Sequence, residues 1–152
     1  MISRLHALVP LRFPVRPVLL ACLLCVEAPA TASPSSAQIV MVGHVPRDRG
    51  SLKCGLFDRE GWLKRPLQSA QAVPAGLRGV CQFQPLAPGS YAWGAYLDEN
   101  DNGRLDFDLT GYPREPYGVS NGVRAHLLLP PSFDAAKIDY PGGELTVQLQ
   151  LE

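Results

Sequence analysis

Short stretches in which apolar and polar residues alternate recur along the chain, and turn residues separate them. Alternation with a period of two is the pattern of a half-buried β-strand. It is clearest near the end of the chain, where Leu145, Val147, Leu149 and Leu151 alternate with polar residues. No long stretch carries the helical period of apolar residues. The pattern therefore predicts an all-β domain.

The alternating segments predict strands at residues 38–45, 51–57, 80–83, 90–97 and 145–151, with residues 123–129 as a further candidate. Residues 59–79 are expected to form a short helix or an irregular excursion. Residues 98–122 form a loop that is long for a small domain, and loops of this length more often have a function than serve only as connections. The spacing favours a small two-sheet sandwich, immunoglobulin-like or transthyretin-like, with one long acidic and aromatic loop.

The N-terminal segment is interpreted as an export signal. Basic residues precede an apolar run that is too short to span a bilayer, and small-x-small sites follow it. We expect cleavage after Ala32, so that residues 1–32 are a signal peptide. Residues 33–37 are then a disordered mature N-terminus, and residues 38–152 are one β-sandwich domain without a transmembrane segment. An uncleaved anchor and lipidation of Cys22 are the alternatives.

Charge and cysteine content agree with export. The formal net charge is +0 and no basic block is present, which argues against a nucleic-acid partner. Cleavage would leave Cys54 and Cys81 in the mature protein. An even pair in an exported domain predicts a disulfide and a location in the periplasm or outside the cell. Two buried thiols are the alternative.

The most specific local signal is the acidic stretch at residues 98–108, which carries a net charge of −4. It begins with D-x-[DN]-x-[DN]-G, the first half of an EF-hand-type calcium loop, and calcium prefers oxygen ligands. The predicted ligands are Asp98, Asn100, Asn102, the Arg104 carbonyl and Asp106, with Asp108 as a further carboxylate.

One element of the calcium loop is missing, because Leu109 stands at position 12, where a bidentate carboxylate belongs. Asp108 or Glu115 is a possible substitute. The alternative is an ion-free turn, since Asp and Asn form turns without any metal.

The second half of the long loop, here called the recognition loop (residues 112–121), mixes aromatic residues, prolines and one ion pair. Flat aromatic rings suit recognition of a saccharide or of a cell-envelope protein. The same rings would alternatively pin the loop over the sandwich. The candidate recognition residues are Tyr112, Arg114, Glu115, Tyr117 and Asn121.

Four ordered segments of the chain resemble a known family. They are residues 89–93, 98–106, 111–121 and 130–136, and the likeness extends over roughly residues 38–152. The chain is similar to the bacterial exported family catalogued as domain of unknown function 2141. The resemblance implies a secreted β domain and gives no activity. Leu97 departs from the family pattern, which leads us to expect His before Asp98.

Known catalytic patterns are missing from the sequence. There is no Ser/His/Asp set, HExxH motif, phosphate loop or nucleotide fingerprint. The sequence therefore favours an exported non-catalytic module that binds calcium through the acidic stretch, and a saccharide or protein partner through the recognition loop. The alternative is a hydrolase or other enzyme that uses the carboxylates of residues 98–115.

Overall fold

The computed structural model describes residues 38–126 and 129–152. It is mostly β-structure, as the alternation predicts. The elements are β1 (Ile39–His44), β2 (Ser51–Phe57), β3 (Gln68–Ala72), β4 (Arg78–Phe83), β5 (Gly89–Asp98), β6 (Tyr117–Val119), the 3-10 turn η1 (Ser120–Gly122), α1 (Phe133–Ala136), β7 (Ile138–Tyr140) and β8 (Leu145–Gln150). The expected signal peptide and mature N-terminus lie outside the described residues.

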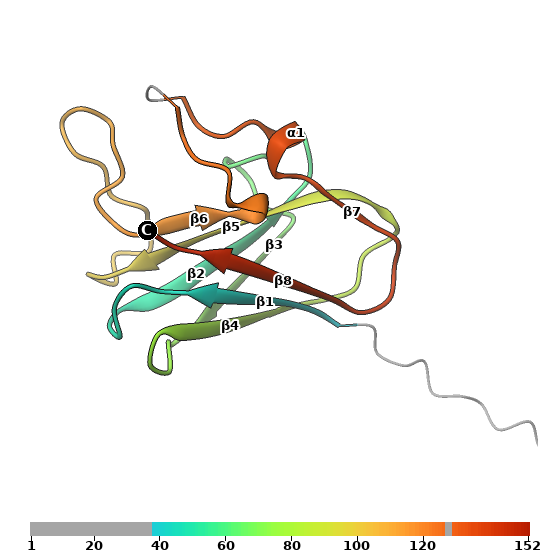
Figure 1. The fold of residues 1–152 in the computed structure, drawn as a ribbon, viewed down its shortest axis with the longest axis horizontal. Helices are drawn as coiled ribbons and strands as arrows, with labels where there is room; N and C mark the ends of the chain where they lie inside the picture. Colours follow the sequence, from blue (N-terminus) through green and yellow to red (C-terminus); the bar gives the residue numbers. More distant parts are fainter. Residues whose placement is uncertain (1–37, 127–128) are drawn as a thin grey trace, which may run out of the picture. The chain divides into compact units, whose positions relative to one another are not determined.

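The strands form two sheets, consistent with a β-sandwich (Figure 1). The three-stranded sheet has the order β4-β1-β8, in which β1 runs antiparallel to β4 and parallel to β8. The five-stranded sheet has the order β3-β2-β5-β6, and β7 also pairs with β5. The long loop leaves the end of β5 and returns as β6, next to the same strand (light orange in Figure 1).

The strands with clear alternation are those that the sequence predicts. Residues 51–57 form β2 with the expected bounds, and the other four differ by a few residues at their ends. The segment expected as a helix or excursion contains β3, which pairs along β2. Residues 123–125 are not a strand, and His126 and Leu129 pair only as an isolated bridge. The sequence of β3 is short and polar, so it carries no alternation that would predict a strand, and two prolines follow residues 123–129 and end that segment.

The core lies between the two sheets and takes one face of each strand. Alternate residues of β2, β5 and β8 are buried there, including Leu56, Trp93 and Leu149. Gly43 and Gly79 face each other in register, and an added Cβ would lie 2.8 and 2.6 Å from a methyl group of Leu52. The two glycines therefore leave the space that Leu52 fills.

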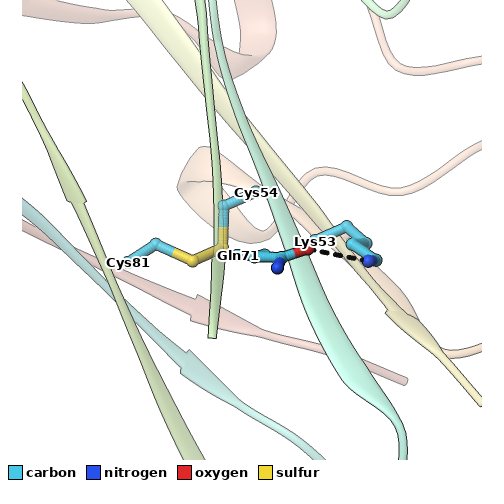
Figure 2. The surroundings of a disulfide bond; sticks show 4 residues. All are labelled: Lys53, Cys54, Gln71 and Cys81. Carbon is cyan, nitrogen blue, oxygen red and sulfur yellow. Dashed lines mark hydrogen bonds between the residues drawn. A yellow bond between two sulfur atoms is a disulfide. The ribbon is translucent and has the colours of Figure 1, made fainter. Parts of the chain in front are cut away.

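A disulfide joins the two sheets through the core. Cys54 of β2 and Cys81 of β4 are bonded, with their Cα atoms 6.5 Å apart, so the pairing expected from the sequence is present (Figure 2). Both cysteines are buried. Beside them on the outer side of β2, Lys53 donates a hydrogen bond to Gln71 of β3 at 2.9 Å. A disulfide in the core is compatible with an oxidising compartment outside the cytoplasm.

A second, smaller core packs against β5 near the start of that strand. Ala92, Val119, Phe133 and Ala136 are buried together, with Trp62 packed against them. Ser120, fully buried, accepts a hydrogen bond from the backbone N–H of Trp93 at 3.0 Å and donates one to the carbonyl of Ala136. These contacts fix the segment after β6 and α1 on the outer face of the five-stranded sheet.

Among the described residues, no helix has the length and apolar character needed to cross a bilayer.

Candidate functional site

The acidic stretch folds around Asp98, whose side chain is fully buried at the end of β5. One carboxylate oxygen accepts a hydrogen bond from the N–H of Asn102 at 3.0 Å, and the other accepts one from Gly103 at 2.8 Å. Asp101 at φ 55° and Gly103 at φ 81° adopt the left-handed conformation, which Asp and Gly tolerate best. These two residues let the chain turn back over Asp98.

Three of the predicted ligands converge beside this turn. One oxygen of Asp106 accepts hydrogen bonds from the side-chain amides of Asn100 at 2.8 Å and Asn102 at 2.9 Å. These bonds, that from Asn100 first, hold the pKa of Asp106 below its usual value. The two amide oxygens accept from backbone N–H groups, at 3.1 Å for Asn100 and 3.0 Å for Asn102. The predicted ligands thus lie together in a turn whose polar groups satisfy one another.

Glu115, in the segment that leads into β6, contacts the acidic stretch through its side chain. Its side chain is buried, with 6% of the residue exposed. One oxygen accepts from the backbone N–H of Glu99 at 2.9 Å and the other from that of Asp106 at 3.1 Å. These residues stand at positions 2 and 9 of the calcium-loop pattern. The structure therefore brings to the loop the carboxylate that the sequence offers as a substitute for position 12.

Cations from β2 and from the segment before it contact two carboxylates of the acidic stretch. Glu99 forms ion pairs with Arg47 at 2.5 Å and Arg49 at 2.7 Å. Burial alone would raise the pKa of Glu99, but the hydrogen bonds from Arg49 and Arg47 outweigh it and lower that pKa. The Lys53 nitrogen lies 3.9 Å from the carboxylate of Asp98. These cations offset much of the charge of −4 that the sequence assigns to the stretch.

The carboxylate of Asp108 serves a separate turn at the tip of the loop. One of its oxygens accepts from the N–H and the hydroxyl of Thr110 at 2.8 and 2.6 Å, and from the N–H of Tyr112 at 3.0 Å. Leu109 at the apex of this turn is fully exposed. No hydrogen bond in the described part of the chain joins Asp108 to the group around Asp98. The structure therefore separates Asp108 from the other predicted ligands.

A coordination shell at the acidic stretch would need oxygens other than carboxylates. Within residues 38–126 and 129–152, no group of three or more His, Cys, Asp or Glu side chains is arranged to hold a metal ion. Amide and backbone carbonyl oxygens would have to complete the six to eight ligands that calcium takes.

The recognition residues separate into two sets. Tyr112 is 54% exposed and Tyr117 is half-buried, and both line the same groove. Arg114 is exposed but is absent from that lining. Glu115 is the buried side chain that accepts hydrogen bonds from Glu99 and Asp106. The side chain of Asn121 donates two hydrogen bonds of 3.0 Å to backbone carbonyls at the end of α1. The two tyrosines are therefore together at a surface, whereas Glu115 and Asn121 hold the backbone.

The groove lies on the outer face of the five-stranded sheet and has two sections. The first, of about 890 Å³, runs over β2 and β5 between the segment after β2 and the acidic stretch. Gly55 and Gly94, paired in register, lie beneath it, and its walls include Leu63, Lys64 and Phe107. The second, of about 620 Å³, shares those three wall residues and extends past prolines and aromatic rings.

The sequence analysis missed most of this groove. Trp62 lies in the segment expected to form a short helix or an excursion, and Phe107 lies inside the acidic stretch, but neither belongs to a recognisable motif. Trp62 donates a hydrogen bond from its indole nitrogen to the carbonyl of Pro131 at 2.7 Å. Its ring meets those of Phe57 and Phe133 edge to face, at centroid distances of 5.5 and 6.0 Å. Trp62 thereby fixes the segment that forms one wall of the groove.

One of the comparisons with known proteins identifies a family. The chain matches no curated protein and no solved structure. Residues 40–148 match the family model DUF2141, which is described as "Uncharacterized protein conserved in bacteria". This match covers most of the chain and all the segments on which the resemblance was based. The chain therefore belongs to the DUF2141 family of uncharacterized bacterial proteins, as its sequence motifs predicted.

Proposed function

We propose that this protein is an exported, non-catalytic β-sandwich module, of immunoglobulin-like or transthyretin-like type, whose acidic stretch binds calcium. The observation that carries the calcium proposal is the position of Glu115. It supplies a buried carboxylate to a loop that otherwise lacks the one required at position 12. The EF-hand spacing of Asp98 to Asp106 supports the same proposal.

Calcium would be held by Asp98, Asn100, Asn102, the Arg104 carbonyl and Asp106, with Glu115 in place of the carboxylate missing at position 12. Both amides would rotate, because their oxygens now accept backbone hydrogen bonds and their nitrogens donate to Asp106. This rearrangement consumes binding energy, and nearby cations oppose a further positive charge. We therefore expect weak binding, with a dissociation constant of about 10⁻⁴–10⁻³ M, as in extracellular calcium modules.

The test is thermal unfolding of the mature domain with increasing calcium, at constant ionic strength. At 100 times the dissociation constant the folded state gains about 2.7 kcal/mol, which raises Tm by several degrees. Asp106→Ala should remove the rise, whereas Asp48→Asn, an exposed acid outside the loop, should retain it. If roughly tens of millimolar calcium does not change Tm, the loop is an ion-free turn. A shift that persists in Asp106→Ala would place the ion elsewhere.

Partner recognition is the second part of the proposal. Tyr112 and Arg114 are exposed near the tip of the long loop, where a saccharide or a cell-envelope protein would contact them. The alternative, an enzyme that uses the loop carboxylates, receives less support. Asp98 and Glu115 are buried and accept backbone hydrogen bonds, so neither side chain reaches a substrate at the surface, although their remaining lone pairs can contact an ion inside the loop. Turnover of a glycoside that is lost in Asp106→Ala would favour the enzyme.

Export is proposed from the N-terminal sequence together with the disulfide. The disulfide supports an oxidising compartment, either the periplasm or the cell exterior. We expect the mature protein to begin at Ser33. Intact-mass measurement on protein recovered from the periplasm or the medium tests this start. A mass that includes residues 1–32, or a lipid on Cys22, would contradict it.

A further inference from the structure

We infer that the groove on the five-stranded sheet is a binding site for a small amphiphilic carboxylate, a molecule with an apolar body and one negatively charged head. This inference goes beyond the proposed function, since it requires neither calcium nor a saccharide. It rests on the floor, the walls and the charge of the groove.

The floor is a patch of sheet formed by two glycines. Gly55 and Gly94 are neighbours in register on β2 and β5. The ring of Phe57 covers Gly55, because a Cβ there would lie 2.6 Å from it. A Cβ on Gly94 would lie 3.5 Å from Phe57 and 3.8 Å from Leu63 and Val119, which is ordinary contact. An apolar group can therefore rest on the backbone at Gly94, between those three side chains.

Two of the three wall residues, Leu63 and Phe107, are apolar, and the turn that carries Leu63 is held in place before any ligand arrives. Leu63, which is 40% exposed, lines both sections and adopts φ 53°, an uncommon conformation for a bulky residue. The turn that imposes it is closed by a hydrogen bond from Gly61 to the Asp58 carboxylate and by two bonds to the Gly61 carbonyl. Phe107 forms the opposite wall with 56% of its surface exposed. Such preformed apolar clefts are typical of small-molecule sites.

The charge of the groove selects the head group. Its larger section is lined by Lys53, Lys64 and Arg104 and by no Asp or Glu. Lys53 lies 3.9 Å from Asp98, and Arg104 lies 3.3 Å from Asp106, so each has an acidic neighbour outside the lining. In the described part of the chain, Lys64 has no ion-pair partner. Glu60 lines only the second section. The larger section therefore has one uncompensated cation, which matches the single negative charge that a carboxylate carries at neutral pH.

Tyr96 adds a hydrogen-bond donor to the same section. A tyrosine hydroxyl carries its proton at neutral pH, so it can donate a hydrogen bond to a carboxylate oxygen. Lys64 lines both sections. If Lys64 binds the head group, the apolar body of the ligand can lie over Gly94 or along the aromatic second section.

The test is a titration of the mature domain with decanoate and, in parallel, with the uncharged decanol, followed by amide NMR shifts. Decanoate should shift Gly55, Gly94 and Val119, and decanol should bind more weakly at the same residues. Lys64→Gln should weaken decanoate binding by up to about fivefold, the effect of an exposed ion pair, and leave decanol binding unchanged. Arg78→Gln removes a cation from β4 on the other sheet and should change neither.

Gly94→Leu should fill the floor and abolish binding of both molecules. Its amide spectrum and melting curve report whether the sheet is intact, and Lys64→Gln tests the charge in a variant that leaves the core untouched. Equal binding of decanol and decanoate, or shifts that map away from β2, β5 and β6, would overturn the inference. So would unchanged decanoate binding in a folded Gly94→Leu protein.

Discussion

Glu115 and Asp106 are joined by a hydrogen bond of 3.1 Å from the Asp106 backbone N–H to a buried carboxylate oxygen of Glu115. The other oxygen of Glu115 holds the N–H of Glu99. A single side chain thus ties both arms of the acidic stretch to the start of β6. The shape of this stretch depends on that tie whether or not an ion binds.

Replacement of Glu115 by Gln should destabilise the domain. One of the two acceptors becomes an NH2 group, which then faces a backbone N–H without an acceptor. An unsatisfied buried group of this kind costs about 1–3 kcal/mol. Urea unfolding measures the change, with the exposed Glu144→Gln as the matched control. If the two variants unfold at the same midpoint, Glu115 is not the tie that the structure indicates.

Reduction of the Cys54–Cys81 disulfide should lower the free energy of unfolding by about 3–4 kcal/mol, because the bond closes a 27-residue loop in the unfolded chain. Unfolding midpoints with and without a reductant measure the loss. The double variant Cys54→Ala/Cys81→Ala should unfold at the same lowered midpoint with and without the reductant. A wild-type midpoint that does not respond to complete reduction would contradict the predicted role of the bond.

Removal of the Ser120 hydroxyl should cost about 1–3 kcal/mol, since the N–H of Trp93 and the carbonyl of Ala136 would both lose a buried partner. Ser120→Ala tests this by chemical denaturation. Ser69→Ala on β3 is the control, because that side chain is exposed. A cost below about 0.5 kcal/mol, the range of ordinary surface changes, would show that Ser120 does not hold α1 to β5.

The tip of the long loop should loosen at acid pH. The hydroxyl of Thr110 first, and then the backbone N–H of Tyr112, lower the pKa of Asp108. A lowered folded-state pKa stabilises the turn at pH values above the unfolded-state pKa of about 3.9, and the contribution is lost as the pH falls through the folded-state pKa.

Amide hydrogen exchange at Thr110 and Tyr112 measures this loosening. Their protection should decrease as the pH falls below about 4, after correction for intrinsic exchange rates. Asp108→Asn keeps an acceptor oxygen in place but cannot titrate in this range, so its protection should stay constant. Equal pH dependence in both proteins would assign the effect to another group.

The sequence by itself determined the strands with strong alternation and the local shape of the acidic stretch. In β2 and β8 every second residue is apolar, and burial of one sheet face requires this order wherever the strand pairs. Gly103 and the Asx residues set the turn around Asp98 because they contact residues only two to five positions away. Such short-range causes can be recognised in a sequence.

Only the tertiary structure decided the strand partners, ion pairs and groove that surround these elements. β3 becomes a strand because β2 offers it a partner, although its own sequence is polar and short. Arg47 and Arg49 reach Glu99, and Lys53 approaches Asp98, across about fifty residues of sequence. The groove likewise depends on pairing that sets Gly55 beside Gly94 and on the rings that fix the segment after β2. These contacts join distant segments, and no local pattern records them, because only the folded chain brings those segments together.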